Sequence, residues 1–231
     1  MVAIVTGGSK GIGFAIARAF IKQGMNVVIS ARKDGELARA VDELGGAERI
    51  AAVRADVRRA ADADRLVNET VQRFGGVDVL VNNAGIGRFA NVADMPIETW
   101  QEVIDTNLSG VFYCCHAAVP ELRRRNGGYI VNIASLAGKN PFVQGAAYCA
   151  SKAGLIAFSE ALMQEVRHDN IRVSYVMPGS VSTDFIGRNA DDSWKLTADD
   201  VAQVVLDLVT LDNRALASRV ELRPSRPPRK S

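Results

Sequence analysis

A tyrosine and a lysine lie four residues apart in the segment AYCASKAG, residues 147–154. Residues at this spacing share one face of a helix, so Tyr148 and Lys152 can act on the same substrate atom. Bringing a tyrosine pKa from ~10 to near neutrality requires about 4 kcal/mol, which one ammonium about 4 Å away supplies at an effective dielectric near 20. The pair is therefore a candidate proton donor with a cationic tuner, although such pairs also occur by chance on solvated helices.

A glycine-rich turn, TGGSKGIG at residues 6–13, lies between a predicted strand and a predicted helix. Gly7, Gly11 and Gly13 permit a tight turn and close approach of backbone amides to a pyrophosphate, and the helix N-terminus attracts the anion. The spacing G-x3-G-x-G differs from G-x-G-x-x-G, so a glycine-rich connector without a ligand is the alternative.

The end of the second predicted strand, VISARKD, indicates which nucleotide is used. It supplies Ser30, Arg32 and Lys33, and Lys10 lies in the glycine turn. These cations can bind a 2′-phosphate, which an acidic residue would repel. We therefore predict NADP(H) in preference to NAD(H). Arg32 and Lys33 as solvated loop charges, with Asp34 as a ribose ligand, form the alternative, but we expect Asp34 to be a helix N-cap.

Short β-branched segments alternate with amphipathic segments along the chain, which predicts an α/β fold. Strands are expected at residues 2–6, 26–31, 49–55, 77–83, 128–134, 171–177 and 215–223, and helices at 12–24, 34–45, 60–74, 98–125, 147–168 and 197–210. Strict alternation favours seven parallel strands in one sheet with helices on both faces. Pro120 should kink or break the fourth helix.

The composition is that of a globular chain. Of 231 residues, 48% are hydrophobic and 23% charged, and the net charge is +2. Without the four basic residues of the last nine, RPSRPPRKS, the net charge would be −2, so no nucleic-acid-binding face is expected. We predict one NADP-binding catalytic domain over residues 1–222 and a basic Pro-rich tail, extended or disordered, over 223–231.

Targeting and metal-binding signals are not found in the sequence. The chain opens MVAIVTGG without a basic leader, and no apolar run approaches eighteen residues, so we expect a cytoplasmic protein with no membrane partner. Cys114, Cys115 and Cys149 fit reduced core residues. The side chains of consecutive Cys114, Cys115 and His116 diverge, and His168 is far along the chain, so we predict no metal site.

Further short motifs follow the later strands in a characteristic order: NNAG at 82–85, Asn107, Ser135, and Pro178-Gly179. Together with the glycine turn and the Tyr148/Lys152 pair, they make residues 2 to about 210 resemble the compact, classical-type short-chain dehydrogenase/reductase family, 3-oxoacyl reductases among them. The resemblance implies a Rossmann-type, doubly wound sheet. It also implies hydride exchange between NAD(P)(H) and a carbonyl/alcohol pair.

The resemblance also implies residue roles. Tyr148 would be the general acid/base, Lys152 its tuner and a ribose ligand, Ser135 the orienter of the substrate carbonyl, and Asn107 the holder of a proton-relay water. Asp56 and Val57 would contact adenine, and Asn82 and Asn83 would pin the backbone. The predicted cofactor contacts are Gly7, Ser9, Lys10, Gly11, Ile12, Gly13, Ser30, Arg32, Asp56, Val57, Asn83, Ala84, Gly85, Tyr148, Lys152, Pro178, Gly179, Val181 and Thr183.

Apolar side chains near the end of the sixth strand suggest the substrate. Phe185, Ile186 and Trp194 can cover an apolar ligand, and Leu136, Phe142 and Phe89 are further candidate walls. We predict a small-to-medium ketone or 3-oxoacyl thioester, with ordinary core packing as the alternative. The run Arg123 to Arg125 could meet an acidic carrier or a CoA phosphate, but we favour stabilisation of a helix C-terminus.

The main hypothesis is an NADPH-dependent carbonyl reductase. The alternatives are a non-catalytic NADP-binding sensor or scaffold and an NAD-dependent alcohol dehydrogenase working in the oxidative direction; an epimerase would need a larger C-terminal domain. Ala153, Gly154 and Ala157 permit close helix contact in a homodimer. A homotetramer is less certain, because the chain lacks the glycine-rich segment that many family members have after the last strand.

Overall fold

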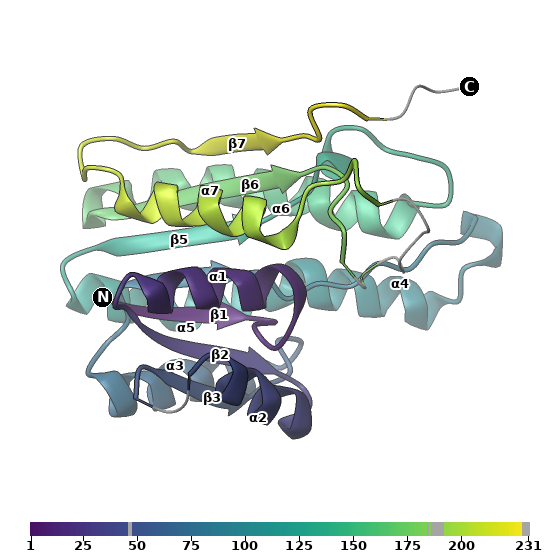
Figure 1. Ribbon diagram of the computed structural model, residues 1–231. Coiled ribbons are helices and arrows are strands. Elements are labelled where there is room, and N and C mark those ends of the chain that lie inside the picture. Colours follow the sequence, from purple (N-terminus) through teal and green to yellow (C-terminus); the bar gives the residue numbers. More distant parts are fainter. Residues whose placement is uncertain (46–47, 184, 186–191, 228–231) are drawn as a thin grey trace.

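The computed structural model describes residues 1–45, 48–183, 185 and 192–227, and its centre is one sheet of seven parallel strands (Figure 1). The strands are β1 Val2–Thr6, β2 Asn26–Ala31, β3 Ile50–Arg54, β4 Val79–Asn82, β5 Gly128–Ile133, β6 Ile171–Pro178 and β7 Arg219–Leu222. Their order is β3-β2-β1-β4-β5-β6-β7. The order reverses between β1 and β4, and at such a switch point an open parallel sheet forms a crevice at its carboxyl edge.

Helices cover both faces of the sheet. They are α1 Gly11–Lys22, α2 Asp34–Glu43, α3 Ala60–Phe74, α4 Ile97–Ile104, α5 Gly110–Arg124, α6 Ala146–Val166 and α7 Ala198–Thr210. One apolar cluster joins α1, α2 and α7 to the sheet, and a second joins α3, α5 and α6 to the opposite face (Figure 1). The predicted doubly wound, Rossmann-type architecture is confirmed.

The strands that line the crevice are buried on both faces. All five residues of β1 and all four of β4 are buried, which explains their nearly uninterrupted apolar sequences. Asn82 and Asn132 are register partners on β4 and β5, and the Asn82 amide donates to Asn132 Oδ1 at 2.8 Å. Asn132 Nδ2 donates in turn to Ser159 Oγ at 2.8 Å, whereas Asn82 Oδ1 has no partner among the described residues.

The segment predicted as one helix over 98–125 is helical from Ile97 to Arg124, but its middle is not α-helical. Residues Asp105–Ser109 form a π-helical turn that separates α4 from α5, whereas α5 continues through Pro120 to Arg124. The π turn inserts one extra residue into the helical ladder and directs Asn107 out of the ordinary register, as such turns often do at functional sites. The α-helical hydrogen-bond pattern is therefore interrupted around Asn107 and not at Pro120.

The carboxyl-terminal elements are shorter and better anchored than expected. β7 covers only the last part of the predicted 215–223 strand. Beyond it, Pro224 Cδ lies 3.2 Å from where a Cβ on Gly179 would be, and Gly179 N donates to Leu222 O at 2.8 Å. The first residues of the predicted tail therefore pack beside Gly179, and residues 228–231 lie outside the described part of the chain.

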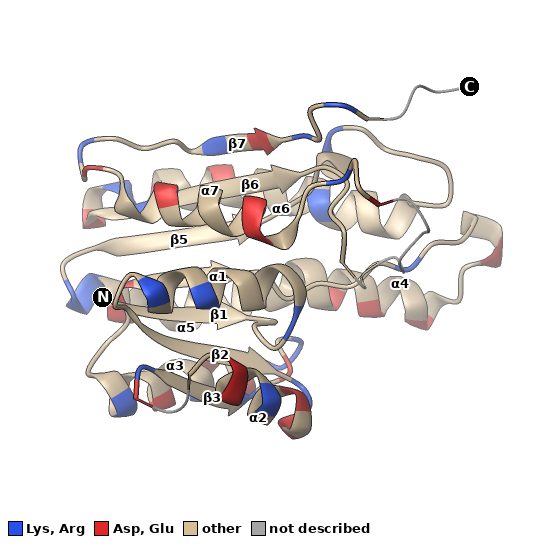
Figure 2. Ribbon diagram, in the orientation of Figure 1, with Lys and Arg blue, Asp and Glu red and all other residues tan. Residues whose placement is uncertain are grey.

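Across the described residues, no helix combines the length and apolar character needed to cross a bilayer. Acidic and basic side chains are interspersed over the helices (Figure 2).

Candidate active site

The glycine turn between β1 and α1 has no room for a side chain at Gly8 or Gly13. Gly7 and Gly11 have φ of +64° and +57°, which L-residues rarely adopt. A Cβ on Gly13 would lie 2.4 Å from Gly7 O, and one on Gly8 would lie 2.6 Å from Ile29 Cγ2. The turn is therefore closed tightly against the sheet, with its outer face formed by backbone.

The first turn of α1 is suited to an anion. It contains no acidic residue, and the preceding Lys10 makes no side-chain cap, so the first amides of the helix have no side-chain acceptor. Lys10 and Gly11 are exposed, and Ser9 and Ile12 are half-buried. Thr183 Cγ2 lies 3.8 Å from where a Cβ on Gly11 would be, so the segment after β6 faces the turn across the groove. A pyrophosphate fits this cradle by the chemistry of its donors.

The loop after β4 is hydrogen-bonded to the start of the glycine turn. Asn83 Nδ2 donates to Thr6 O at 3.0 Å and Gly7 O at 3.2 Å, and Thr6 Oγ1 accepts from the amides of Asn83 and Ala84. The prediction that Asn83 pins backbone is confirmed. For Asn82 it is wrong, because its amide donates to the side chains of Asn132 and Cys115 inside the sheet.

Asn107 connects three elements through its buried side chain. Its Nδ2 donates to Ile86 O at 2.9 Å and to Ser151 Oγ at 3.1 Å, and its Oδ1 accepts from Ile86 N at 2.8 Å. A Cβ on Gly85 would lie 3.3 Å from Asn107 Oδ1 and 3.7 Å from Lys152 Nζ. The structure thus brings together the π turn, the loop after β4 and helix α6.

Lys152 is a buried cation with one hydrogen-bond partner given by the structure. Its Nζ donates to Ile133 O at 2.8 Å, at the end of β5. Burial lowers the pKa of Lys152 to about 8. Gly85 has no side chain, and a Cβ there would lie 3.7 Å from the ammonium.

Burial has the largest effect on the pKa of the Tyr148 phenol. Burial raises the pKa of Tyr148, and its hydrogen bond with Ser135 only partly offsets that increase. Lys152 Nζ lies 5.8 Å from the Tyr148 ring centroid and is directed to Ile133 O. Desolvation is the largest effect on the phenol in this structure, and the prediction that Lys152 lowers the pKa of Tyr148 stays a prediction. At neutral pH the hydroxyl carries its proton.

The Ser135 hydroxyl takes part in a turn and also meets Tyr148. It precedes a short 3-10 turn, Leu136–Gly138, and its Oγ accepts from Ala137 N at 3.1 Å. The same hydroxyl group is hydrogen-bonded with Tyr148. The turn thus holds the serine where it meets the phenol.

Aromatic rings surround the Tyr148 side chain. Phe89 lies edge-on at 5.8 Å between centroids, Phe185 is tilted at 5.8 Å, and Phe142 contacts Phe89 at 5.6 Å. Phe89, Phe142 and Phe185 remain 37%, 48% and 42% exposed. They are therefore available to an apolar ligand and are not ordinary core. Trp194 lies beside Lys195, and Ile186 is outside the described residues.

The adenosine end of the crevice contains Arg32, exposed directly after β2. Asp34 is wrong as an N-cap: it is the first residue of α2 and pairs with Arg54 at 3.6 Å. Ser30 is buried, and its Oγ has no partner among the described residues. Asp56 accepts a bidentate contact from Arg58, which lowers the pKa of the Asp56 carboxyl.

The remaining predicted contacts lie after β3 and around the end of β6. Val57 lies 2.9 Å from where a Cβ on Gly110 would be, at the start of α5. Pro178 ends β6, and Val181 forms an isolated bridge with Leu196. These positions, together with Gly179, follow the carboxyl edge of the sheet.

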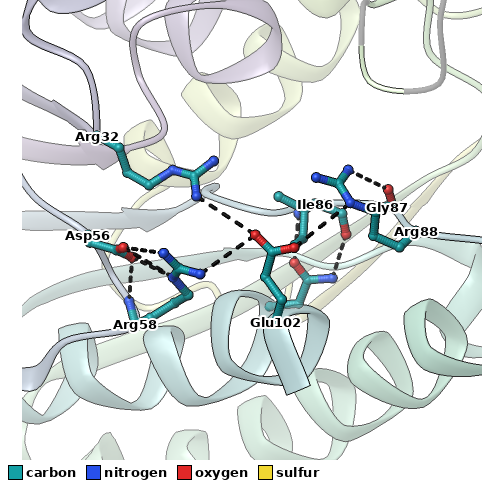
Figure 3. Close-up of polar contacts among 8 residues, drawn as sticks. Arg32, Asp56, Arg58, Ile86, Gly87, Arg88 and Glu102 are labelled. Atoms are coloured by element: carbon teal, nitrogen blue, oxygen red, sulfur yellow. Dashed lines mark hydrogen bonds and ion pairs between the residues drawn. The ribbon is translucent and has the colours of Figure 1, made fainter. Parts of the chain in front are cut away.

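Sequence reasoning missed the arginines and the glutamate near Arg32. Arg58 lies two residues after the predicted adenine contact Asp56, which was an available signal. Glu102 and Arg88 had no local signal, because they approach Arg32 only in the fold (Figure 3).

Two other predicted features have structural roles. Arg123, Arg124 and Arg125 pair with Asp169, Glu121 and Asp78, so specific carboxylates bind the run that was assigned to the helix dipole. The three cysteines are buried and unpaired, and burial raises the pKa of the Cys114 thiol to about 12. Within the described ranges, no group of three or more His, Cys, Asp or Glu side chains is arranged to hold a metal ion.

Comparison with known proteins adds a family to this geometry. A model of the short chain dehydrogenase family matches residues 1–194. A 3-oxoacyl-[acyl-carrier-protein] reductase of Synechocystis is 41% identical over 186 residues, covering 79% of this chain and 75% of the relative. A 3beta-hydroxysteroid dehydrogenase of Eggerthella lenta is 44% identical over 185 residues, covering 78% and 70%. The closed form of a serine dehydrogenase complexed with NADP+ superimposes with a TM-score of 0.89 at 31% identity, covering 96% and 94%.

Proposed function

Since the chain belongs to the short chain dehydrogenase family, whose members are oxidoreductases of CH–OH and C=O groups, we propose that it is an NADPH-dependent carbonyl reductase. The observation that carries the proposal is the geometry around Tyr148: Lys152 Nζ lies 5.8 Å from its ring centroid, and the rings of Phe89 and Phe185 lie beside it. Burial also raises the pKa of the Tyr148 hydroxyl, so at neutral pH it holds the proton that a reduced carbonyl oxygen needs.

The site residues divide the work of the reaction. Ser135 donates a hydrogen bond to the substrate carbonyl oxygen, and Tyr148 delivers its proton to that oxygen as the alcohol forms. A bound reduced nicotinamide supplies the hydride that the carbonyl carbon accepts. Lys152 keeps a positive charge beside Gly85, where it binds ribose hydroxyls and stabilises the phenolate left after proton transfer. Asn107 fixes the loop of Ile86 that borders this space.

Arg32 supports the preference for NADP(H). It is exposed at the end of β2, where a dinucleotide fold places the adenosine ribose, and guanidinium binds phosphate bidentately. Asp34, the carboxylate that could have bound ribose hydroxyls, pairs with Arg54 instead. The serine dehydrogenase structure with NADP+ is consistent with this proposal. The full set of predicted cofactor contacts remains part of it.

The substrate is proposed to be an apolar ketone or a 3-oxoacyl thioester. Phe89, Phe142 and Phe185 form an aromatic, partly exposed surface above Tyr148. The names of the relatives indicate acyl, steroid and amino-acid substrates. Membership of the family therefore does not identify the substrate class of this chain. Pairing of Arg123 to Arg125 with internal acids weakens the case for a docked acidic carrier at that position.

Domain, assembly and compartment complete the proposal. We place one catalytic unit at residues 1–222 and a basic tail after it. A homodimer would form through α5 and α6, where Ala153 and Ala157 are exposed and Phe112, whose ring centroid lies 6.5 Å from that of Phe158, is 49% exposed. Three buried, unpaired thiols support a reducing, cytoplasmic compartment.

The direct test replaces the proton donor. Tyr148→Phe should lower turnover of NADPH with a panel of ketones and 3-oxoacyl thioesters by about 1000-fold or more, because general acid catalysis is lost. Binding of NADPH, measured by quenching of protein fluorescence, should change less than about 3-fold.

The matched control is Tyr113→Phe on α5, which removes the same atom outside the crevice and should leave turnover intact. Activity retained by Tyr148→Phe would exclude the proposed mechanism. Equal wild-type turnover with NADH and NADPH would exclude the proposed cofactor preference.

A further inference from the structure

Three arginines from different parts of the chain surround one glutamate at the mouth of the crevice (Figure 3). Glu102 on α4 lies 3.9 Å from Arg32, 3.6 Å from Arg58 and 3.9 Å from Arg88. Its side chain is 28% exposed, so solvent only partly screens the group. Such convergence on a single carboxylate is unusual for solvated surface charges.

The contacts of Glu102 are looser than those of its neighbour Asp56. Arg58 holds Asp56 with atoms 2.6 to 2.9 Å apart, in a bidentate arrangement. None of the three arginine–Glu102 distances reaches hydrogen-bond range. Arg58 uses Nε and Nη2 on Asp56, and Arg88 uses Nη1 on Gly87 O. Glu102 makes no hydrogen bond to Arg58 Nη1 or to Arg32 Nη1, so these donors stay available to a stronger anion.

The network spans the switch point of the sheet. Arg32 follows β2 and Arg58 follows β3, on one side of the reversal in strand order, whereas α4 and Arg88 follow β4 on the other. The Arg32–Glu102 contact thus crosses the crevice at its adenosine end. The three guanidinium groups and the two carboxylates, Glu102 and Asp56, leave one positive charge in excess.

We propose that Glu102 is a specificity-determining residue whose carboxylate competes with the 2′-phosphate of NADP(H) for Arg32 and Arg58. This inference rests on the proposed preference for NADP(H). A phosphate monoester carries more charge than a carboxylate and offers three acceptor oxygens, so it displaces Glu102 from the guanidinium groups. A nucleotide without the 2′-phosphate leaves the network unchanged. Glu102 therefore lowers the ratio of the affinity for NADP(H) to the affinity for NAD(H).

The test measures nucleotide binding without turnover. The full chain is titrated calorimetrically with adenosine 2′,5′-bisphosphate and with 5′-AMP. Glu102→Gln should tighten binding of the bisphosphate by about 3- to 10-fold, the range expected for removing a partly screened competing charge, and change 5′-AMP binding by less than about 2-fold. In an Arg32→Gln background the same substitution should have a smaller effect.

Glu98→Gln is the matched control. Glu98 lies one turn earlier on α4, is exposed, and loses the same charge in this variant, yet it should leave the ratio of the two affinities unchanged. A Glu102→Gln variant in which the bisphosphate binds equally or more weakly, with an unchanged melting temperature, would overturn the role of Glu102 alone. Wild-type protein that binds both nucleotides equally would instead overturn the underlying preference for NADP(H).

Discussion

The glycine turn and the aromatic surface above Tyr148 are built in opposite ways. Asn83 Nδ2 donates to Thr6 O, and Thr6 Oγ1 accepts from Ala84 N, so side chains hold the backbone of the turn, and a Cβ at Gly13 would collide with Gly7 O. Phe89 and Phe142 contact one another through ring faces and edges and stay partly exposed. Hydrogen bonds fix direction as well as distance, whereas ring contacts tolerate shifts.

The rigid turn suits a ligand of constant shape, and the exposed rings suit ligands of variable shape. A pyrophosphate has one shape and needs amides at fixed positions. Apolar substrates differ in shape, and a surface of rings can adapt to them at little cost. Lys152 and Tyr148 lie where the two regions meet, because both are on α6 between the loop after β4 and the rings.

The largest effect is expected where the regions meet. Lys152→Met should lower turnover by about 100-fold or more, because the positive charge beside the phenol and ribose is lost. The same variant should be more stable by about 1 to 3 kcal/mol at pH 7, because a buried ammonium is removed. Chemical denaturation and steady-state kinetics measure the two changes.

The pH dependence of stability tests whether burial of the Lys152 ammonium causes this difference. Burial lowers the folded-state pKa of Lys152 from 10.5 to about 8, so the unfolded state binds its proton more tightly. Wild-type stability relative to the variant should rise between pH 8 and 10.5 as this penalty disappears, and turnover should fall above about pH 8. Exposed Lys22→Met is the control, and a variant that is less stable than wild type at pH 7 would contradict the interpretation.

A smaller effect is expected from breaking the rigid region. Gly13→Ala should weaken NADPH binding by roughly 10- to 100-fold, because its Cβ would lie 2.4 Å from Gly7 O and the turn must move. Gly35→Ala is the matched control, since a Cβ there meets nothing within 4 Å. Fluorescence titration measures both, and equal affinities would show that the turn is adaptable after all.

The smallest effect is expected from the aromatic surface. Phe142→Ala should raise KM for bulky apolar ketones by about 3- to 10-fold through lost apolar contact, while KM for NADPH stays unchanged. Val143→Ala, at a residue that is 85% exposed, should change neither. Kinetics with ketones of increasing size test this, and an effect on NADPH alone would join the rings to the cofactor region.

The sequence predicted the fold well because each strand and helix carries a local pattern. The β1 and β2 boundaries agree at every residue, since β-branched runs end at glycine and charged residues. The interrupted helix was missed because the π turn depends on contacts of Asn107 with Ile86 and Ser151, which are distant in the chain.

The sequence named side chains that the fold brings near one another, but it did not predict their electrostatics. Tyr148 and Lys152 do share a face of α6, yet spacing does not tell how much water each loses or that Ile133 O receives the ammonium. Burial decides the pKa of both groups. Glu102 lies 70 residues from Arg32 in sequence, so only the folded sheet brings them together.

The contact of β7 with Gly179 also orders events in time. A ribosome delivers β1 and the glycine turn first, and β7, which pairs with β6, comes after every other strand. Gly179 gains its partners Leu222 and Pro224, and Lys139 its partner Glu221, only when these last residues have emerged. The glycine turn therefore leaves the ribosome long before the residues that pack beside Gly179 do.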